Sequence, residues 1–315
     1  MEDILTAYPK TYSKDKRTPI EKLYHSFYNL SKNKAWKLSV IDKHIIKHEN
    51  KKLVFPLISL TTKTKGKAIW LISGIHGEES AGPIALAKSL GSFKSLAEKG
   101  IPFVILPLCN PSGYFRNWRY LFHAKDWKIG RSIGDCEHVL VNSKNKPRTR
   151  FKPLKQTQKF VDEVLKLIKE YPPLFVIDLH EDDPNTAEGD PYYGKEDNKT
   201  TYVYSQGKLG HQDPIAKEVI RILKKHKHPL ESSGRVASAA KERIINGIVC
   251  NMKDSSIDEL LASEKVYEKN KIIKKFPADS VVIIETLTTV PLGKRLKIHM
   301  EILASLKKFI SLEKS

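Results

Sequence analysis

Residues 68–80 have the sequence AIWLISGIHGEES, a short apolar run followed by a turn rich in glycine and charge. The apolar run, 68–74, is rich in large and β-branched side chains and ends on glycine, which predicts a buried β-strand. Residues 80–90 show helical periodicity, with Gly91 placed to end the helix, and residues 101–108 form a second apolar run. A strand, a helix and a strand in this order are typical of a βαβ unit in a parallel sheet.

The same alternation of strands and helices continues along the chain beyond this unit. Two further buried strands are expected at residues 174–179 and 281–284. We therefore predict one large α/β domain at residues 61–315, with a small N-terminal segment at residues 1–60 that packs against it. The other expected elements are helices at 17–36, 156–170, 214–227 and 291–310, a strand hairpin at 38–60, and loop regions at 110–150 and 181–212.

The chain is strongly basic, with 55 Lys and Arg against 36 Asp and Glu and a formal net charge of +19 over 315 residues. Its lysines are scattered from Lys10 to Lys314, so most of them are expected to be solvated surface residues. The positive charge favours acidic substrates through long-range attraction. Because no nucleic-acid-binding motif accompanies the charge, we expect no nucleic-acid partner. The sequence does not indicate an oligomeric state.

The cysteine content favours a reducing compartment. Cys109, Cys136 and Cys250 form no CxxC pattern, and such a sparse, odd count is typical of reduced thiols in a cytoplasmic protein. The chain opens on Met-Glu-Asp without the apolar segment of a signal peptide. No apolar run approaches the roughly 20 residues that span a bilayer. We therefore expect a cytoplasmic protein without a membrane partner.

His76 and Glu79 lie three residues apart on the turn after the first strand, where both side chains can face one point. Ligands of open α/β sheets bind outside the carboxyl ends of the strands. An imidazole nitrogen and a carboxylate oxygen both suit zinc, and Gly74 and Gly77 allow the backbone to bend close to a metal. The alternative is a helix N-terminus at which Glu78 and Glu79 complement the helix dipole.

His180 follows the strand expected at residues 174–179. If this strand neighbours the first strand in a parallel sheet, His76 and His180 project from the same edge. Two histidines and one glutamate, with a fourth position open for water, form the ligand set of a catalytic zinc. Asp178, two residues earlier on the same strand face, could orient a ligand histidine. The alternatives are a hydrogen-bonded histidine at a strand end for His180, an N-terminal cap or a loop contact for Asp178, and loop acids for residues 181–183.

Glu285 follows the strand expected at residues 281–284. A carboxylate at the end of a buried strand is costly unless it is paired or functional. Beside a zinc site it would accept a proton from zinc-bound water and pass it to the leaving amine. The alternative is a structural ion pair with one of the many lysines.

The segment NPSGYFRNWR, residues 110–119, follows the second strand of the βαβ unit and holds Arg116 and Arg119 three positions apart. Such a pair can address a carbonyl oxygen and a carboxylate together. A guanidinium near the metal would also stabilise the oxyanion of a tetrahedral intermediate. The alternative is a pair of surface arginines stacked on Tyr114 or Trp118.

These four motifs, in this order, resemble the zinc carboxypeptidase family, the relatives of carboxypeptidase A, over residues 65–305. His76-Gly77-Glu78-Glu79 is similar to the family's His-x-x-Glu, His180 to its third ligand and Glu285 to its general base. Residues 110–113, Asn-Pro-Ser-Gly, are similar to its Asn-Pro-Asp-Gly stretch, with serine in place of aspartate. The Asp-Leu-His-Glu strand end and the Glu-Thr before a helix that starts with Pro-Leu are typical of its compact prokaryotic members.

The resemblance implies a mixed, mainly parallel eight-stranded sheet flanked by helices. It implies one zinc ion, held by His76, Glu79 and His180, and hydrolysis of a peptide or amide bond next to a C-terminal residue. The family's Asn-Arg pair that clamps the substrate carboxylate has no counterpart between Arg119 and Arg150, and Arg131 is a possible substitute. The residues implied for the site are Glu285 and Arg119 in catalysis and Asn110, Arg116 and Arg131 in substrate binding, with Tyr192, Tyr193, Tyr202 and Tyr204 as candidates to cover the substrate.

Two other functions compete with this interpretation. A zinc deacylase of the aspartoacylase and succinylglutamate desuccinylase type shares the ligand pattern and the sheet, and cleaves N-acyl amino acids. A basic binding protein without catalysis would bind acidic surfaces or nucleic acid in a salt-sensitive way and would need no metal. The Asn-Pro-Ser-Gly stretch and the C-terminal Glu-Thr and Pro-Leu pattern favour the peptidase.

Overall fold

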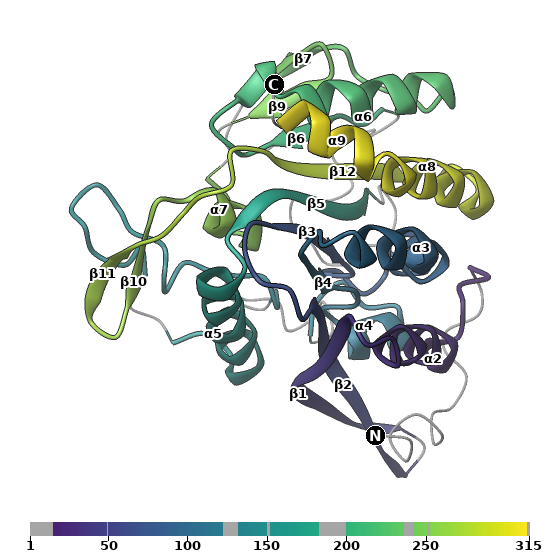
Figure 1. The fold of residues 1–315 in the computed structure, drawn as a ribbon, viewed down its shortest axis with the longest axis vertical. Coiled ribbons are helices and arrows are strands. Elements are labelled where there is room, and N and C mark those ends of the chain that lie inside the picture. Colours follow the sequence, from purple (N-terminus) through teal and green to yellow (C-terminus); the bar gives the residue numbers. More distant parts are fainter. Residues whose placement is uncertain are drawn as a thin grey trace.

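A mixed sheet of ten strands runs through the part of the chain that the structure, a computed structural model, describes (Figure 1). The strand order across the sheet is β1-β2-β4-β3-β5-β12-β6-β9-β8-β7. The described residues are 15–48, 50–121, 132–149, 152–182, 200–235, 242–250 and 253–313.

The centre of the sheet is parallel and its margins are largely antiparallel. β4, β3, β5 and β12 pair side by side in the parallel sense, whereas the hairpin β1-β2 and the strand β6 join this centre in the antiparallel sense. The strands of the sheet are β1 (Trp36–His48), β2 (Lys51–Thr62), β3 (Ala68–Ser73), β4 (Phe103–Leu106), β5 (Pro173–Asp182), β6 (Val203–Ser205), β7 (Ser233–Arg235), β8 (Arg243–Ile245), β9 (Ile248–Cys250) and β12 (Val281–Leu287).

The mixed α/β fold expected from the sequence is confirmed, and the strand count differs from the eight expected. Four of the ten strands, β6, β7, β8 and β9, have only three residues each. Segments this short carry too few positions for alternation of apolar and polar side chains to stand out in a sequence. A separate two-stranded sheet joins β10 (Lys265–Glu268) and β11 (Lys271–Lys274).

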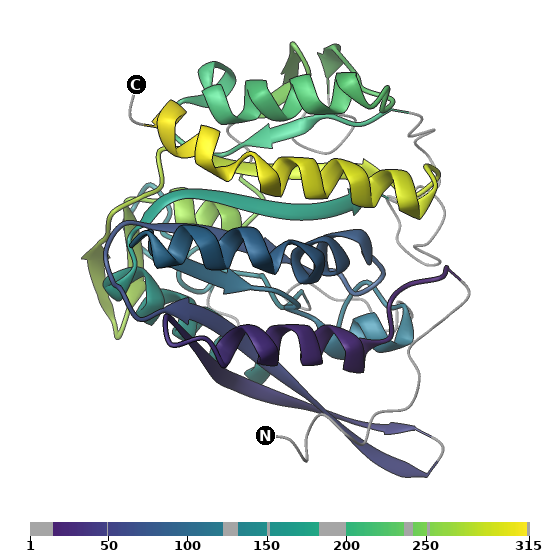
Figure 2. The same ribbon diagram turned by 45° about the vertical axis from the view of Figure 1, so that its right-hand side comes forward.

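Helices cover both faces of the sheet, and each face has its own apolar core. In Figure 2, α2, α3, α8 and α6 lie in front of the sheet, and with α9 they bury the first core. α5 and α7 bury the second core on the opposite face. Leu71 faces the first core and its neighbours Trp70 and Ile72 face the second, as alternation along a strand requires. The helices are α2 (Ile20–Ser31), α3 (Ala81–Glu98), α4 (Pro111–Arg116), α5 (Lys155–Glu170), α6 (Pro214–Lys225), α7 (Ile257–Ala262), α8 (Leu292–Ala304) and α9 (Leu306–Glu313).

Some elements extend beyond the expected boundaries or were not expected. α3 continues past Gly91 to Glu98, because Phe93 and Ala97 in its second half are buried in the first core. α4 lies in a segment expected to be loop, with the Asn110 side chain capping its N-terminus. The closing helix is divided into α8 and α9. The loop expected at 181–212 contains β6, and residues 183–199 lie outside the described part.

The N-terminal segment shares the sheet and the core with the rest of the chain. β2 pairs with β4, and α2 packs on α3 with Leu23 and Phe27 buried in the first core. Strand β2 continues to Thr62, across the position at which the sequence suggested a boundary. Among the described residues, no helix is both long and apolar enough to cross a membrane.

A buried ion pair ties three elements together next to the ends of the central strands. Glu181, expected as a loop acid, is instead a buried residue of β5. One of its carboxylate oxygens accepts a hydrogen bond of 2.7 Å from the backbone N–H of Ala81, at the start of α3. The other pairs with Arg295 of α8, whose side chain is also buried. The sheet thus fixes the beginning of α3, directly after the turn that holds His76 and Glu79.

We expect the change Glu181→Ala to lower the free energy of unfolding by about 3 kcal/mol, because it leaves the guanidinium of Arg295 buried without its partner. Glu163→Ala is the matched control, since Glu163 pairs with Lys166 at the exposed surface of α5. It should change stability by less than about 1 kcal/mol. Urea unfolding of both variants measures the difference, and equal losses would contradict a special role of Glu181.

Candidate metal centre and active site

The ends of β3 and β5 bring His76, Glu79 and His180 to one edge of the sheet. The two strands are parallel neighbours, and their register pairs Ser73 with Leu179, so His180 lies beside the turn that follows β3. Gly77 is required in this turn because a Cβ atom there would lie 2.1 Å from the backbone carbonyl carbon of Gly113. The turn therefore packs directly on the start of α4.

The three side chains converge on one point. Nδ1 of His76 lies 2.6 Å from Oε1 of Glu79, and Nδ1 of His180 lies 2.9 Å from Oε2 of the same carboxylate. The two imidazole rings are 5.1 Å apart between centroids. One donor atom from each residue lies within 4.8 Å of the others, as a shared metal ion requires. Glu79 is only 1% exposed, so neighbouring side chains rather than water stabilise its charge.

The chemistry of this group fits a divalent cation such as zinc. Among the described residues, neither Nδ1 of His180 nor Oε2 of Glu79 has a hydrogen-bond partner, although both are buried and face each other. Buried polar atoms without partners are rare and mark a place for an ion or another ligand. Two imidazole nitrogens and one carboxylate oxygen are also the donor types that zinc prefers at a site with one open position.

The charges around the group also favour a cation. Burial alone would raise the pKa of Glu79, but the imidazoles of His76 and His180 hold it well below its usual range. Burial lowers the pKa of His76 to about 4, and the neighbouring Arg119 adds to the shift. For His180, burial opposes protonation, but Asp178 and Glu79 raise its pKa well above the usual value. A positive charge is therefore stabilised between these carboxylates.

Asp178 stands behind His180 in the way expected for a residue that orients a ligand. It is fully buried in β5, and its Oδ2 lies 3.1 Å from Nε2 of His180. The carboxylate thus faces the ring nitrogen that points away from Glu79. A carboxylate in this position fixes the orientation of a ligand imidazole and raises its basicity.

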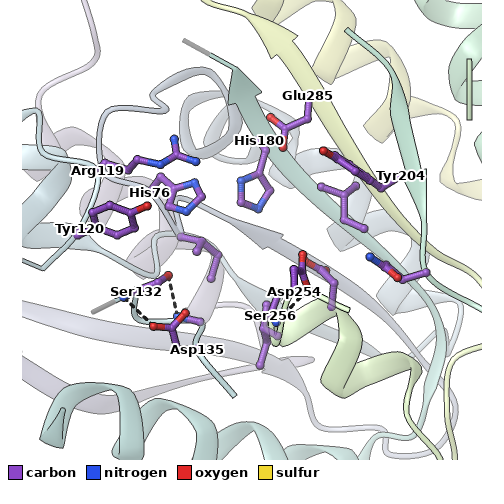
Figure 3. Close-up of a pocket in the computed structure, with 16 residues that line it drawn as sticks. His76, Arg119, Tyr120, Ser132, Asp135, His180, Tyr204, Asp254, Ser256 and Glu285 are labelled. Atoms are coloured by element: carbon purple, nitrogen blue, oxygen red, sulfur yellow. Dashed lines mark hydrogen bonds between the residues drawn. The ribbon is translucent and has the colours of Figure 1, made fainter. Parts of the chain in front are cut away.

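Glu285 lies beside His180 across the next pair of strands. β12 is parallel to β5, and its register pairs Glu285 with His180. Burial raises the pKa of Glu285 to about 8, with His180 opposing the shift and Glu79 and Asp182 adding to it. No salt bridge joins Glu285 to a lysine within the described residues, so the alternative of a structural ion pair has no support there. Figure 3 shows its carboxylate next to the His180 imidazole.

Arg119 completes this side of the site. Its Nη1 donates to Oε1 of Glu78 at 2.7 Å and lies 3.2 Å from Oε1 of Glu79. Arg119, His76, His180 and Glu285 line one cavity of about 260 Å³ (Figure 3). Glu78 was expected at most to complement a helix dipole. The structure instead pairs it with Arg119, while Glu181 supplies the acceptor at the start of α3.

Asn110 and Arg116, which the resemblance implied for substrate binding, make structural contacts instead. Asn110 is fully buried; its Oδ1 accepts from the backbone of Gly113 at 3.0 Å and its amide donates to the backbone carbonyl of Arg119 at 3.1 Å. Asn110 therefore shapes the backbone that carries Arg119. The guanidinium of Arg116 lies 4.4 Å from the Trp118 ring centroid and donates to the backbone carbonyl of Lys47, away from the metal group.

Arg116 therefore shows the stacking that the sequence left open as the alternative, and it lines a different cavity together with His44 and Ser112. Among the candidate tyrosines, Tyr204 lines the cavity of the metal group, and its hydroxyl lies 3.3 Å from that of Tyr202. The remaining candidates, Arg131, Tyr192 and Tyr193, lie outside the described residues.

Several cavity residues were not anticipated from the sequence. Asp135, Asp254 and Asp258 line the cavity, together with Ser132 and Ser256. They come from the segment before β12 and from the loop region expected at 110–150, where nothing in the local pattern distinguishes them from ordinary surface acids. Only the fold places these segments opposite the strand ends.

Comparison with known proteins identifies the fold. No protein-family model and no curated protein matches the sequence. A presumed metallopeptidase from Shewanella baltica has a similar structure, with a TM-score of 0.67 and 17% identity over 98% of both chains. A presumed metallopeptidase from Shewanella amazonensis is similar with a TM-score of 0.62 and 19% identity over 93% of this chain and 92% of its own. A metallo-carboxypeptidase from Burkholderia cenocepacia is similar with a TM-score of 0.54 and 12% identity, over 94% and 70%. The chain has the metallo-carboxypeptidase fold that the sequence resemblance implied.

We expect graded losses of metal affinity from two substitutions. Asp178→Asn should weaken zinc binding about 10- to 100-fold, because it removes the carboxylate that orients His180 but leaves the three donors in place. His76→Ala removes a donor and should weaken binding further. Competition with a chromophoric chelator measures both affinities.

His226→Ala is the control, since His226 pairs with Glu301 on another surface and should leave zinc affinity unchanged. Wild-type affinity in the His76→Ala variant would rule out this group as the metal site.

Proposed function

We propose that this chain is a zinc-dependent hydrolase of the metallo-carboxypeptidase type, which cleaves a peptide or amide bond next to a C-terminal residue. The observation that carries the proposal is the convergence of His76, Glu79 and His180 on one point, with Glu285 and Arg119 on the same cavity. The resemblance of the fold to metallo-carboxypeptidases supports it. A cytoplasmic location, which the sparse cysteines suggested, stays a prediction.

A zinc ion held by His76, Glu79 and His180 would supply Lewis-acid chemistry and lower the pKa of a bound water to about 7. Glu285 is the general base in this proposal and removes a proton from the attacking water. Its half-buried carboxyl group, with a pKa raised to about 8, can accept a proton and later donate it near neutral pH. The same carboxyl group returns the proton to the leaving amine.

Arg119 stabilises the negative charge that develops on the carbonyl oxygen. Its guanidinium faces the cavity, and the buried carboxylate of Glu78 holds it in place at 2.7 Å. Because the charge and the donors are already oriented, little reorganisation is needed when the oxyanion forms. Asn110 contributes by holding the backbone carbonyl of Arg119. We keep Arg131 as the proposed partner of the substrate carboxylate.

The zinc deacylase remains the second candidate, because it would use the same metal group and base. The two functions differ in the product that they release. Release of a C-terminal residue from N-blocked peptides supports the peptidase, and release of acetate or succinate from N-acyl amino acids supports the deacylase. A protein that holds zinc and cleaves neither type of substrate would contradict both.

We expect Glu285→Gln to retain zinc and to lower kcat by about 10²- to 10⁴-fold, because it removes the base without removing a metal donor. Zinc content by elemental analysis and kcat on a cleaved substrate check the two parts separately. Glu264→Gln, an exposed acid between α7 and β10 that does not line the cavity, is the control. Full activity of Glu285→Gln would show that another group acts as the base.

A further inference from the structure

The cavity has a second wall, opposite the metal group, that is acidic. Figure 3 shows Asp135 and Asp254 on the side of the cavity away from Arg119, His76 and His180. Asp258, near the start of α7, lines the same cavity. Among the described residues that line it, Arg119 is the one lysine or arginine, and it belongs to the metal side. Three aspartates on a cavity with a single guanidinium are unexpected in a chain with a net charge of +19.

Asp258 has an oxygen that the described part of the protein leaves unused. The residue is 5% exposed, and its Oδ1 has no hydrogen-bond partner among the described residues. Asp258 also lies close to the metal group, because one of its carboxylate oxygens is within 4.8 Å of donor atoms of His180 and Asp178. Asp178 already faces Nε2 of His180, which leaves Asp258 available to a ligand in the cavity. A buried carboxyl oxygen without a partner costs stability unless a ligand supplies a donor.

Asp135 and Asp254 are held in place by short turns of their own backbone. Oδ2 of Asp135 accepts from the N–H of Ser132 at 3.1 Å, and Oδ1 of Asp254 accepts from the N–H of Ser256 at 3.0 Å. Burial raises the pKa of Asp135 to about 6, and the neighbouring carboxylates add to the shift. The acids of this wall thus repel one another, and a cation between them would relieve the repulsion.

Two basic residues near the acidic wall, Arg148 and Lys275, are engaged elsewhere, and Lys253, which precedes Asp254, is exposed and does not line the cavity. Arg148 contacts Ser255 in the same segment, but its guanidinium forms a two-pronged ion pair with Glu259. Lys275 donates to the backbone carbonyl of Leu261. Neither side chain lines the cavity. Within the described residues, no lysine or arginine therefore lines the acidic wall of the cavity.

We propose that Asp135, Asp254 and Asp258 form a subsite for the positively charged side chain of the substrate's C-terminal residue. The preferred substrates are then peptides or amides with a C-terminal lysine, arginine or diamino acid. This inference rests on the proposed function. The subsite reverses the expectation of acidic substrates. The net charge of the chain acts on a substrate at long distance, whereas the aspartates of the cavity would contact the bound substrate and therefore decide which one is preferred. Carboxylates that contact an ammonium or a guanidinium form the stronger, charge-assisted class of hydrogen bonds.

Binding of single amino acids tests the subsite without any hydrolysis. L-Lysine and L-norleucine have the same carbon chain and differ by the terminal ammonium, so calorimetric titration of the zinc-loaded full chain isolates that group. We expect lysine to bind about tenfold more tightly or better. Asp135→Asn and Asp254→Asn keep the oxygen that accepts from the backbone and should each reduce the preference about tenfold.

Asp162→Asn is the matched control, since Asp162 is exposed on α5 and does not line the cavity. It should leave the preference for lysine unchanged. Equal affinities for lysine and norleucine, or an unchanged preference in both cavity variants, would overturn the inference.

Hydrolysis separates this inference from the proposed function. Four N-blocked peptides that differ only in a C-terminal lysine, arginine, norleucine or glutamate should give kcat/KM values about tenfold higher for the two basic residues. Cleavage with no preference for lysine or arginine overturns the subsite while the peptidase stands. Tighter binding of lysine without cleavage of any peptide supports the subsite and overturns the peptidase.

Discussion

The parallel pairing of β5 with β3 on one side and with β12 on the other is the constraint on which the site depends. It sets His180 beside the turn that carries His76 and Glu79, and pairs Glu285 with His180 in register. A shift of one residue in a strand moves every side chain to the opposite face. The two apolar cores fix the register, because each strand buries alternating residues on both faces.

The electrostatics of the site follow from gathering carboxylates at one buried edge. Glu79 lies between two imidazoles, Glu78 pairs with Arg119, and Asp178 faces His180. Glu285 has no such salt bridge among the described residues, and burial raises its pKa to about 8. Burial also raises the pKa of Glu78, to about 7, although Arg119 opposes that shift. Neighbours of opposite charge lower the pKa of a buried carboxyl group and the loss of solvent raises it, so the balance differs from one acid to the next. The neighbouring acids therefore differ in pKa. These differences suit the roles proposed for Glu79 as a metal ligand, Glu78 as the anchor of Arg119 and Glu285 as the base.

Close packing around the turn after β3 gives the site its rigidity. Gly77 touches the backbone at Gly113, and the N–H of Gly77 donates to the carbonyl of Arg119. The side chain of Asn110 binds that same carbonyl and caps α4. The metal group and the guanidinium that faces it are therefore held by one network. On the other side, the buried pair of Glu181 and Arg295 anchors α3 to β5 and α8.

Local sequence patterns were sufficient to predict the α/β class, the four central strands and the residues of the candidate metal group, because apolar runs that end in His180, Glu285 or the His76 turn can be recognised within a short window. The sequence by itself did not determine the three-residue strands, the path of α3 beyond Gly91, or the pairing of Glu181. The three-dimensional packing places Arg116 against the ring of Trp118 and Arg119 against Glu78. It alone assembled Asp135, Asp254 and Asp258 from separate segments. Side-chain direction and contacts between distant segments depend on the packing of the whole chain, which periodicity within a short window does not encode.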